Sequence, residues 1–87
     1  MKIVARKIRM IAVFDDGSGV PRPLRFMMNE EGVDVVVRVE RIISVERKRT
    51  GGIDCFVYLC QSTIRGGEVL YELKYVIGEC QWQIYKM

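Results

Sequence analysis

Residues 72–85 read ELKYVIGECQWQIY, and their alternation predicts an antiparallel β-hairpin. Gly78-Glu79 suits a two-residue type II′ turn, because glycine adopts the positive φ that the first turn position requires. That turn sets Ile77 opposite Cys80, and the register continues through Val76–Gln81, Tyr75–Trp82, Lys74–Gln83, Leu73–Ile84 and Glu72–Tyr85. One face of the hairpin is then apolar, whereas a slip of one residue would set apolar side chains opposite polar ones along the whole ladder.

Turn signals recur at short intervals along the rest of the chain. They lie at residues 15–19, 29–32, 50–52, 65–67 and 77–79. These five turns separate six candidate strands, a pattern typical of an all-β fold rather than of βαβ units. We therefore predict a six-stranded antiparallel meander that forms a small barrel or a strongly bent sheet, with an open sheet that dimerises as the alternative architecture.

Three of these segments carry distinctive signals. Residues 3–14 are predicted as one strand, apolar on both faces from Met10 onward. Pro21 and Pro23 lack N–H donors on the same side, which places that segment at a sheet edge or in a crossing. Residues 33–49 are too long for one straight strand, so we expect a bend or bulge at residues 40–42; a short helix through Val39, Ile42 and Ile43 is the rival interpretation.

The length of 87 residues indicates a single domain spanning residues 1–87. No signal peptide and no apolar run of the ~20 residues needed for a membrane span is visible, so we expect a cytoplasmic protein without a membrane partner. Cys55, Cys60 and Cys80 are odd in number and all lie in apolar runs, which favours buried free thiols.

The residue types offer little for catalysis. The chain has no histidine, which removes the commonest general base and metal ligand. The acidic pairs Asp15-Asp16 and Glu30-Glu31 fit turn chemistry better than a cation site. We expect no cofactor, no metal and no enzymatic activity; an enzyme or small-ligand protein using a barrel mouth near Asp15 and Asp16 is the least favoured alternative.

One basic and aromatic grouping suggests a binding function. Arg47, Lys48 and Arg49 lead through Gly51-Gly52 to Phe56 and Tyr58. A two-residue loop at the glycines sets Arg47 opposite Phe56 and Arg49 opposite Asp54. Cations beside aromatic rings on a small β-domain are typical of single-stranded nucleic-acid binding, so these five residues are the candidate contact set. The alternative is that the rings are core and the charges a solvated strand end.

Residues 53–61 are apolar on both faces, which predicts a central strand or one that meets a partner chain. Self-association through a strand edge or sheet face would cover the apolar surface that so short a chain cannot bury, and a complete monomeric barrel is the alternative. The sequence as a whole predicts a non-enzymatic β module that acts by binding, as a homo-oligomer or a small subunit, with a single-stranded nucleic-acid accessory protein as the second hypothesis.

Residues 11–15 and 23–26, with VERII at 39–43, YELKY at 71–75 and Trp82, resemble a group of short, uncharacterised bacterial all-β proteins of similar length. The resemblance covers most of the chain. It implies a stand-alone cytoplasmic domain and transfers no catalytic or binding residue, because the group has no established activity.

Overall fold

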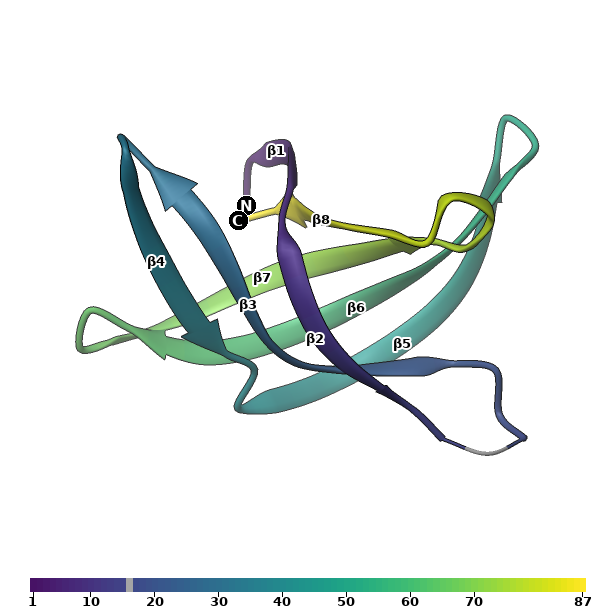
Figure 1. Ribbon diagram of the computed structural model, residues 1–87, viewed down its shortest axis with the longest axis horizontal. Helices are drawn as coiled ribbons and strands as arrows, with labels where there is room; N and C mark the ends of the chain where they lie inside the picture. Colours follow the sequence, from purple (N-terminus) through teal and green to yellow (C-terminus); the bar gives the residue numbers. More distant parts are fainter. Residues whose placement is uncertain (16) are drawn as a thin grey trace.

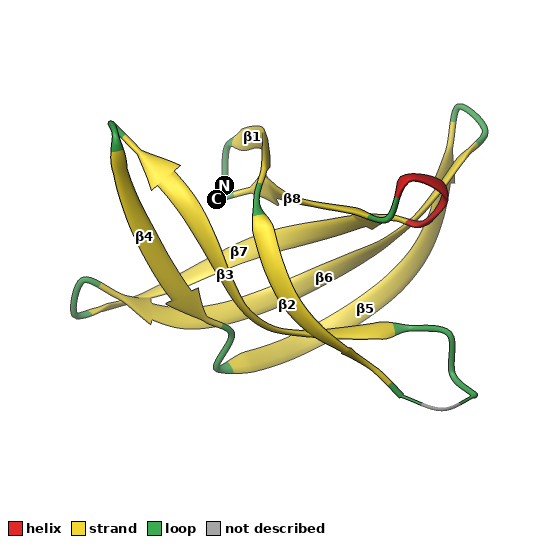
Figure 2. Ribbon diagram, in the orientation of Figure 1, coloured by secondary structure: helices red, strands yellow, loops and turns green. Residues whose placement is uncertain are grey.

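The computed structural model describes residues 1–15 and 17–87, and these residues form eight β-strands and one short 3-10 turn (Figures 1 and 2). The strands are β1 (Ile3–Lys7), β2 (Arg9–Phe14), β3 (Pro21–Glu30), β4 (Val33–Arg38), β5 (Arg41–Thr50), β6 (Ile53–Ile64), β7 (Gly67–Val76) and β8 (Gln81–Lys86), and the turn is η1 (Ile77–Glu79). In this described part of the chain no helix is long and apolar enough to cross a membrane.

The strands build two antiparallel sheets. A five-stranded sheet has the order β1-β8-β7-β6-β5, and a three-stranded sheet has the order β2-β3-β4. Figure 1 shows the small sheet lying across the large one, with its strands crossing those of β5–β7. Each sheet therefore covers one face of the other, as apolar strand faces require.

The core lies between the two sheets. The small sheet contributes Phe26, Met28 and Val37, and the large sheet contributes a longer row from β6, β7 and β8. That row consists of Phe56, Tyr58, Cys60, Tyr71, Leu73, Tyr75, Trp82 and Ile84. Aromatic rings join the layers, since Phe26 meets Tyr71 edge-on with centroids 5.7 Å apart. The core thus depends on large aromatic side chains, which bury much apolar area per residue.

The all-β antiparallel prediction is confirmed, but the six-stranded meander and the closed barrel are wrong. The predicted strand at residues 3–14 is two strands, because the chain passes from one sheet to the other at Ile8. There the Ile8 N–H donates to the Trp82 carbonyl over 3.2 Å, while β1 pairs with β8 and β2 with β3. The predicted long segment 33–49 likewise divides between the sheets, so the chain forms a two-layer structure with open edges.

The C-terminal hairpin has the predicted register at four of its pairs, from Val76↔Gln81 to Leu73↔Ile84. The turn differs: η1 replaces the two-residue loop, and Cys80 follows in the left-handed region with a φ of 51°. The ladder is also interrupted by a bulge, so that Glu72 lies opposite Lys86 and not Tyr85. The apolar alternation therefore fixed the register without fixing the turn.

The bend expected at residues 40–42 is confirmed, because β4 ends at Arg38, β5 begins at Arg41 and a bulge follows between Ile42 and Ser44. No helix forms there, so the rival interpretation is wrong.

The positions of Pro21 and Pro23 are also explained by the pairing of β3. This strand pairs with β2 as far as Pro21, but its pairing with β4 extends only to Arg25. The proline end of β3 therefore has a strand on one side only, where a missing N–H costs nothing.

Candidate binding surfaces

The basic segment of β5 lies at the outer edge of the large sheet. Arg47 is opposite Phe56 and Arg49 is opposite Asp54, as predicted, and Gly51 and Gly52 form the two-residue loop with φ values of 58° and 81°. Asp54 lies 3.9 Å from Arg47 and 3.8 Å from Arg49, and Lys48 lies 3.5 Å from Glu46. The three cations are exposed, but each has a carboxylate beside it on the same strand pair.

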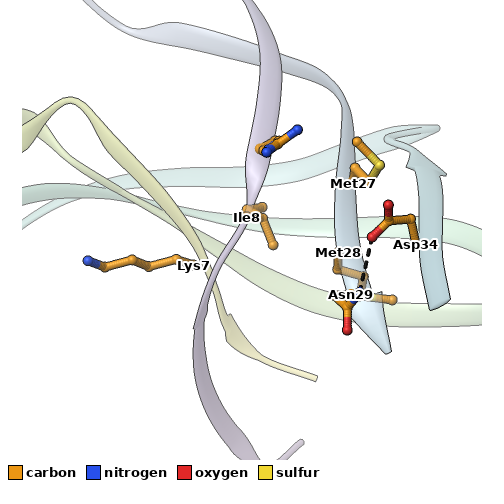
Figure 3. Close-up of a pocket in the computed structure, with 7 residues that line it drawn as sticks. Lys7, Ile8, Met27, Met28, Asn29 and Asp34 are labelled. Carbon is orange, nitrogen blue, oxygen red and sulfur yellow. Dashed lines mark hydrogen bonds between the residues drawn. The ribbon is translucent and has the colours of Figure 1, made fainter. Parts of the chain in front are cut away.

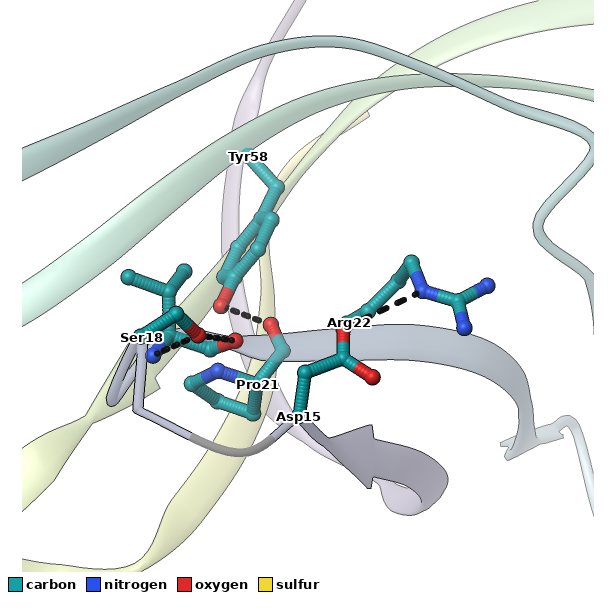
Figure 4. Close-up of polar contacts among 6 residues, drawn as sticks. Asp15, Ser18, Pro21, Arg22 and Tyr58 are labelled. Carbon is teal, nitrogen blue, oxygen red and sulfur yellow. Dashed lines mark hydrogen bonds and ion pairs between the residues drawn. The ribbon is translucent and has the colours of Figure 1, made fainter.

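The two aromatic residues of the predicted contact set face the core. Phe56 is 7% exposed and Tyr58 is 1% exposed. The Tyr58 hydroxyl donates a hydrogen bond to the Pro21 carbonyl, as Figure 4 shows, and burial raises the pKa of this phenol. Buried rings offer no face on which a base can stack. The structure therefore brings Arg47 within 5.8 Å of the Phe56 ring but leaves only the cations accessible.

A second basic surface, which the sequence analysis missed, lies on the face of the small sheet that points away from the core. We call it the outer arginine face, and it comprises Arg9, Ile11, Arg25, Met27, Val36 and Arg38. These residues form two rows across β2, β3 and β4. One row is Arg9, Met27 and Val36, and the other is Ile11, Arg25 and Arg38. Ile11 is 51% exposed and Val36 is 65% exposed.

The charges of the outer arginine face are not balanced within the described part of the chain. Arg25 and Arg38 are directly opposite on neighbouring strands, a like-charge placement that destabilises a sheet. Neither has a carboxylate within ion-pair distance among the residues described, and the same is true of Arg9. Shallow depressions of about 450 and 630 Å³ lie over this face. The face combines exposed apolar groups with unneutralised cations, a composition that suits contact with another macromolecule.

A third depression, of about 330 Å³, lies where β1 leads into β2 beside the end of β3 (Figure 3). Its polar groups include Asn29 and Asp34, on paired strands. The Asn29 side-chain N–H₂ donates to the Asp34 carboxylate over 3.1 Å, and the Asn29 side-chain oxygen accepts from the Gly32 N–H over 3.1 Å. Asn29 thus holds the β3–β4 turn and orients Asp34 on the outer side of β4.

Asp15 follows β2, Glu30 ends β3, and both make ion pairs. Asp15 is 4.0 Å from Arg22 (Figure 4), and Glu30 is 2.7 Å from Arg65. Glu31 occupies a turn position with a φ of 51°, and Asp16 lies outside the described residues. Over residues 1–15 and 17–87, no three potential ligand side chains are grouped as a metal site requires.

The three cysteines are free. Cys55 and Cys60 are buried as predicted, and burial raises the pKa of the Cys60 thiol to about 12. Cys80 is exposed, which corrects the prediction that it packs in the core; the turn at η1 carries it out of the ladder.

Comparison of the chain with known proteins gives no match among family models, curated proteins or solved structures.

Proposed function

We propose that this protein is a non-enzymatic β module that acts by binding, and that self-association is the first of its contacts. The observation that carries the proposal is the small sheet, which exposes the apolar side chains of Ile11 and Val36 and, within the described residues, leaves the edge of the valine-rich strand β4 without a neighbouring strand. Contiguous apolar surface of this kind is found where proteins meet partners.

The titratable groups whose pKa values depart from the ordinary range lie in the core. Among the residues that the structure describes, the groups with raised pKa values are the phenols of Tyr58, Tyr71 and Tyr75 and the thiol of Cys60, and burial is the first cause in each case. All four side chains belong to the core cluster between the sheets. Their neutral forms stabilise packing, and none of them faces the depressions on the surface.

Sedimentation velocity over a wide range of protein concentration tests the proposal. We expect a concentration-dependent shift from monomer to dimer, because a small interface between identical chains associates reversibly. A sedimentation coefficient that stays at the monomer value up to the highest concentration would contradict self-association.

Single-stranded nucleic acid is the second candidate partner, and the unbalanced arginines of the outer arginine face are the observation that favours it. Cations without carboxylate neighbours bind phosphates and release their counterions, so the affinity should fall steeply as salt rises. Fluorescence anisotropy of labelled single-stranded DNA and RNA at low and moderate salt measures this.

Two double variants identify the surface used. The change Arg9→Ala with Arg25→Ala removes two charges from the outer arginine face, and Arg47→Ala with Arg49→Ala removes two from β5. Each is the charge-matched control for the other. Loss of affinity in the first alone would locate binding on the outer arginine face, and loss in the second alone on β5. Absent or salt-independent binding by the unaltered protein contradicts the nucleic-acid candidate.

A further inference from the structure

Strand β4 is the least protected edge of the two sheets. The described chain has four edge strands, β1, β2, β4 and β5. Bulges interrupt the pairing of three of them, β1, β2 and β5, whereas β4 pairs with β3 over six consecutive positions without one. Bulges and edge charges are the devices that prevent strand-to-strand association. β5 has both, since four of its ten residues are cations.

The sequence of β4, VDVVVR, has the opposite character. Four of its six residues are valine, and Val33 and Val36 are 61% and 65% exposed. Its two charged residues, Asp34 and Arg38, have opposite signs. A regular, valine-rich edge with balanced charges is suited to pairing with another strand.

The backbone groups that such a strand would meet follow from the pairing with β3. The Val39 N–H donates to the Leu24 carbonyl over 2.8 Å, so residue 39 points its backbone groups toward β3. Backbone direction alternates along an antiparallel strand, so residues 37, 35 and 33 also point toward β3. Asp34 and Val36 therefore present both backbone groups to the free edge, and Arg38 presents its N–H there. The Arg38 carbonyl also turns from β3, but one of its two lone pairs already accepts from the Ser62 hydroxyl of β6 over 2.6 Å, which leaves the other for a second strand.

We infer that β4 pairs with β4 of a second copy of this chain, antiparallel, about a two-fold axis at Val36. This inference rests on the proposed self-association and names its interface. With Val36 opposite Val36 of the second copy, Asp34 lies opposite Arg38 of the second copy, and the same contact occurs again across the axis. If the register shifts by two residues toward the start of β4, Asp34 lies opposite Val36 of the second copy, and both contacts between Asp34 and Arg38 are lost.

The pairing also accounts for the unbalanced arginines. In one chain Arg38 faces Arg25 and has no carboxylate among the described residues. In the paired form the Asp34 carboxylate of the second copy lies beside Arg38, so an opposite charge offsets the like-charge pair. The two small sheets join into one six-stranded antiparallel sheet, and the two outer arginine faces become continuous.

A charge-exchange experiment tests this register. Asp34→Arg sets like charges opposite each other at both contacts, and so does Arg38→Asp. Each variant alone should dimerise about tenfold or more weakly than the unaltered chain, because two attractive cross-strand pairs become repulsive. Mixing the two variants restores opposite charges at both contacts, so a mixed dimer should form with close to the original affinity.

Sedimentation velocity of each variant and of the equimolar mixture measures dimerisation. A second test compares Val36→Lys with Ile11→Lys, its matched control. Both valine and isoleucine are exposed on the same face, but only Val36 lies on the proposed axis. Weak single variants with a restored mixture, and a dimer lost in Val36→Lys alone, are the expected results. A dimer that these β4 changes leave intact overturns the β4 interface, whereas an unaltered chain that remains monomeric overturns the proposed self-association itself.

Discussion

Replacing Ser62 by alanine should destabilise the protein more than its small size suggests. Ser62 is fully buried on β6 and joins the two sheets. Its hydroxyl proton is donated to the Arg38 carbonyl over 2.6 Å, so the Tyr71 hydroxyl, also 2.6 Å away, must donate to the Ser62 oxygen. Alanine removes both bonds and leaves a buried phenol without an acceptor, together with a partly buried carbonyl without this donor.

An unsatisfied buried polar group costs about 1–3 kcal/mol, and a lost neutral hydrogen bond costs about 0.5–1.5 kcal/mol. We therefore expect Ser62→Ala to lower the free energy of unfolding by about 2–3 kcal/mol. For a domain of this size, that corresponds to a Tm roughly 8–24 °C lower. Tyr71→Phe should cost less, about 1 kcal/mol, because Ser62 keeps its bond to Arg38.

Urea unfolding followed by Trp82 fluorescence measures these differences, since Trp82 is buried in the core. The double variant should cost less than the sum of the two single variants, because without the Tyr71 hydroxyl no phenol is stranded. Ser44→Ala, the same change at an exposed site of β5, should stay within about 0.5 kcal/mol of the unaltered protein. A Ser62→Ala cost equal to that of Ser44→Ala, or additivity in the double variant, would refute the network.

Three further predictions follow from burial and charge. A thiol reagent should modify one cysteine of the folded protein, Cys80, and all three after denaturation; rapid modification of Cys55 or Cys60 in the native state would contradict their placement. In the folded state, burial raises the pKa of the Cys60 thiol from 9.0 to about 12 and that of the Tyr71 phenol from 10.0 to about 12. The unfolded chain therefore releases these protons at lower pH than the folded protein does. The contribution of Cys60 and Tyr71 to the free energy of unfolding should be constant below pH 9 and fall above it. Cys60→Ala should make the decline between pH 9 and 10 shallower in urea titrations, and an unchanged slope would count against a buried thiol there. Asp54→Asn should cost less than about 1 kcal/mol, since its arginine partners are exposed, and should raise the affinity for polyanions if β5 binds them; an unchanged affinity would show that β5 is not the surface used.

The sequence predicted the strands well because alternation and turn residues act locally. The register from Leu73 to Val76 and the loop at Gly51-Gly52 each depend on neighbours within one hairpin, and the bend before Arg41 coincides with a local break in the alternation. The division into two sheets depends instead on contacts far apart in sequence. Ile8 separates β1 from β2 by bonding to the Trp82 carbonyl, and no local signal at Ile8 indicates that partner.

The candidate sites show the same difference between local signals and long-range contacts. Residues 53–61 are apolar on both faces, so the sequence could not indicate which face holds Phe56 and Tyr58, and the structure places both in the core. The outer arginine face was missed, although one signal was present. The turn at Glu31-Gly32 makes Glu30 face Val33, and counting back along that ladder sets Arg25 opposite Arg38. Assigning registers to every predicted hairpin, and not only to the last, would have found this pair.

Amide hydrogen exchange along β4 tests the proposed pairing most directly. In a single chain the N–H groups of Asp34, Val36 and Arg38 point to the free edge, while those of Val35 and Val37 point toward β3. We predict that the first three exchange rapidly in dilute protein and become protected as the concentration rises, whereas the other two are protected throughout. Rapid exchange of Asp34, Val36 and Arg38 under conditions where sedimentation shows a dimer would contradict the β4 interface.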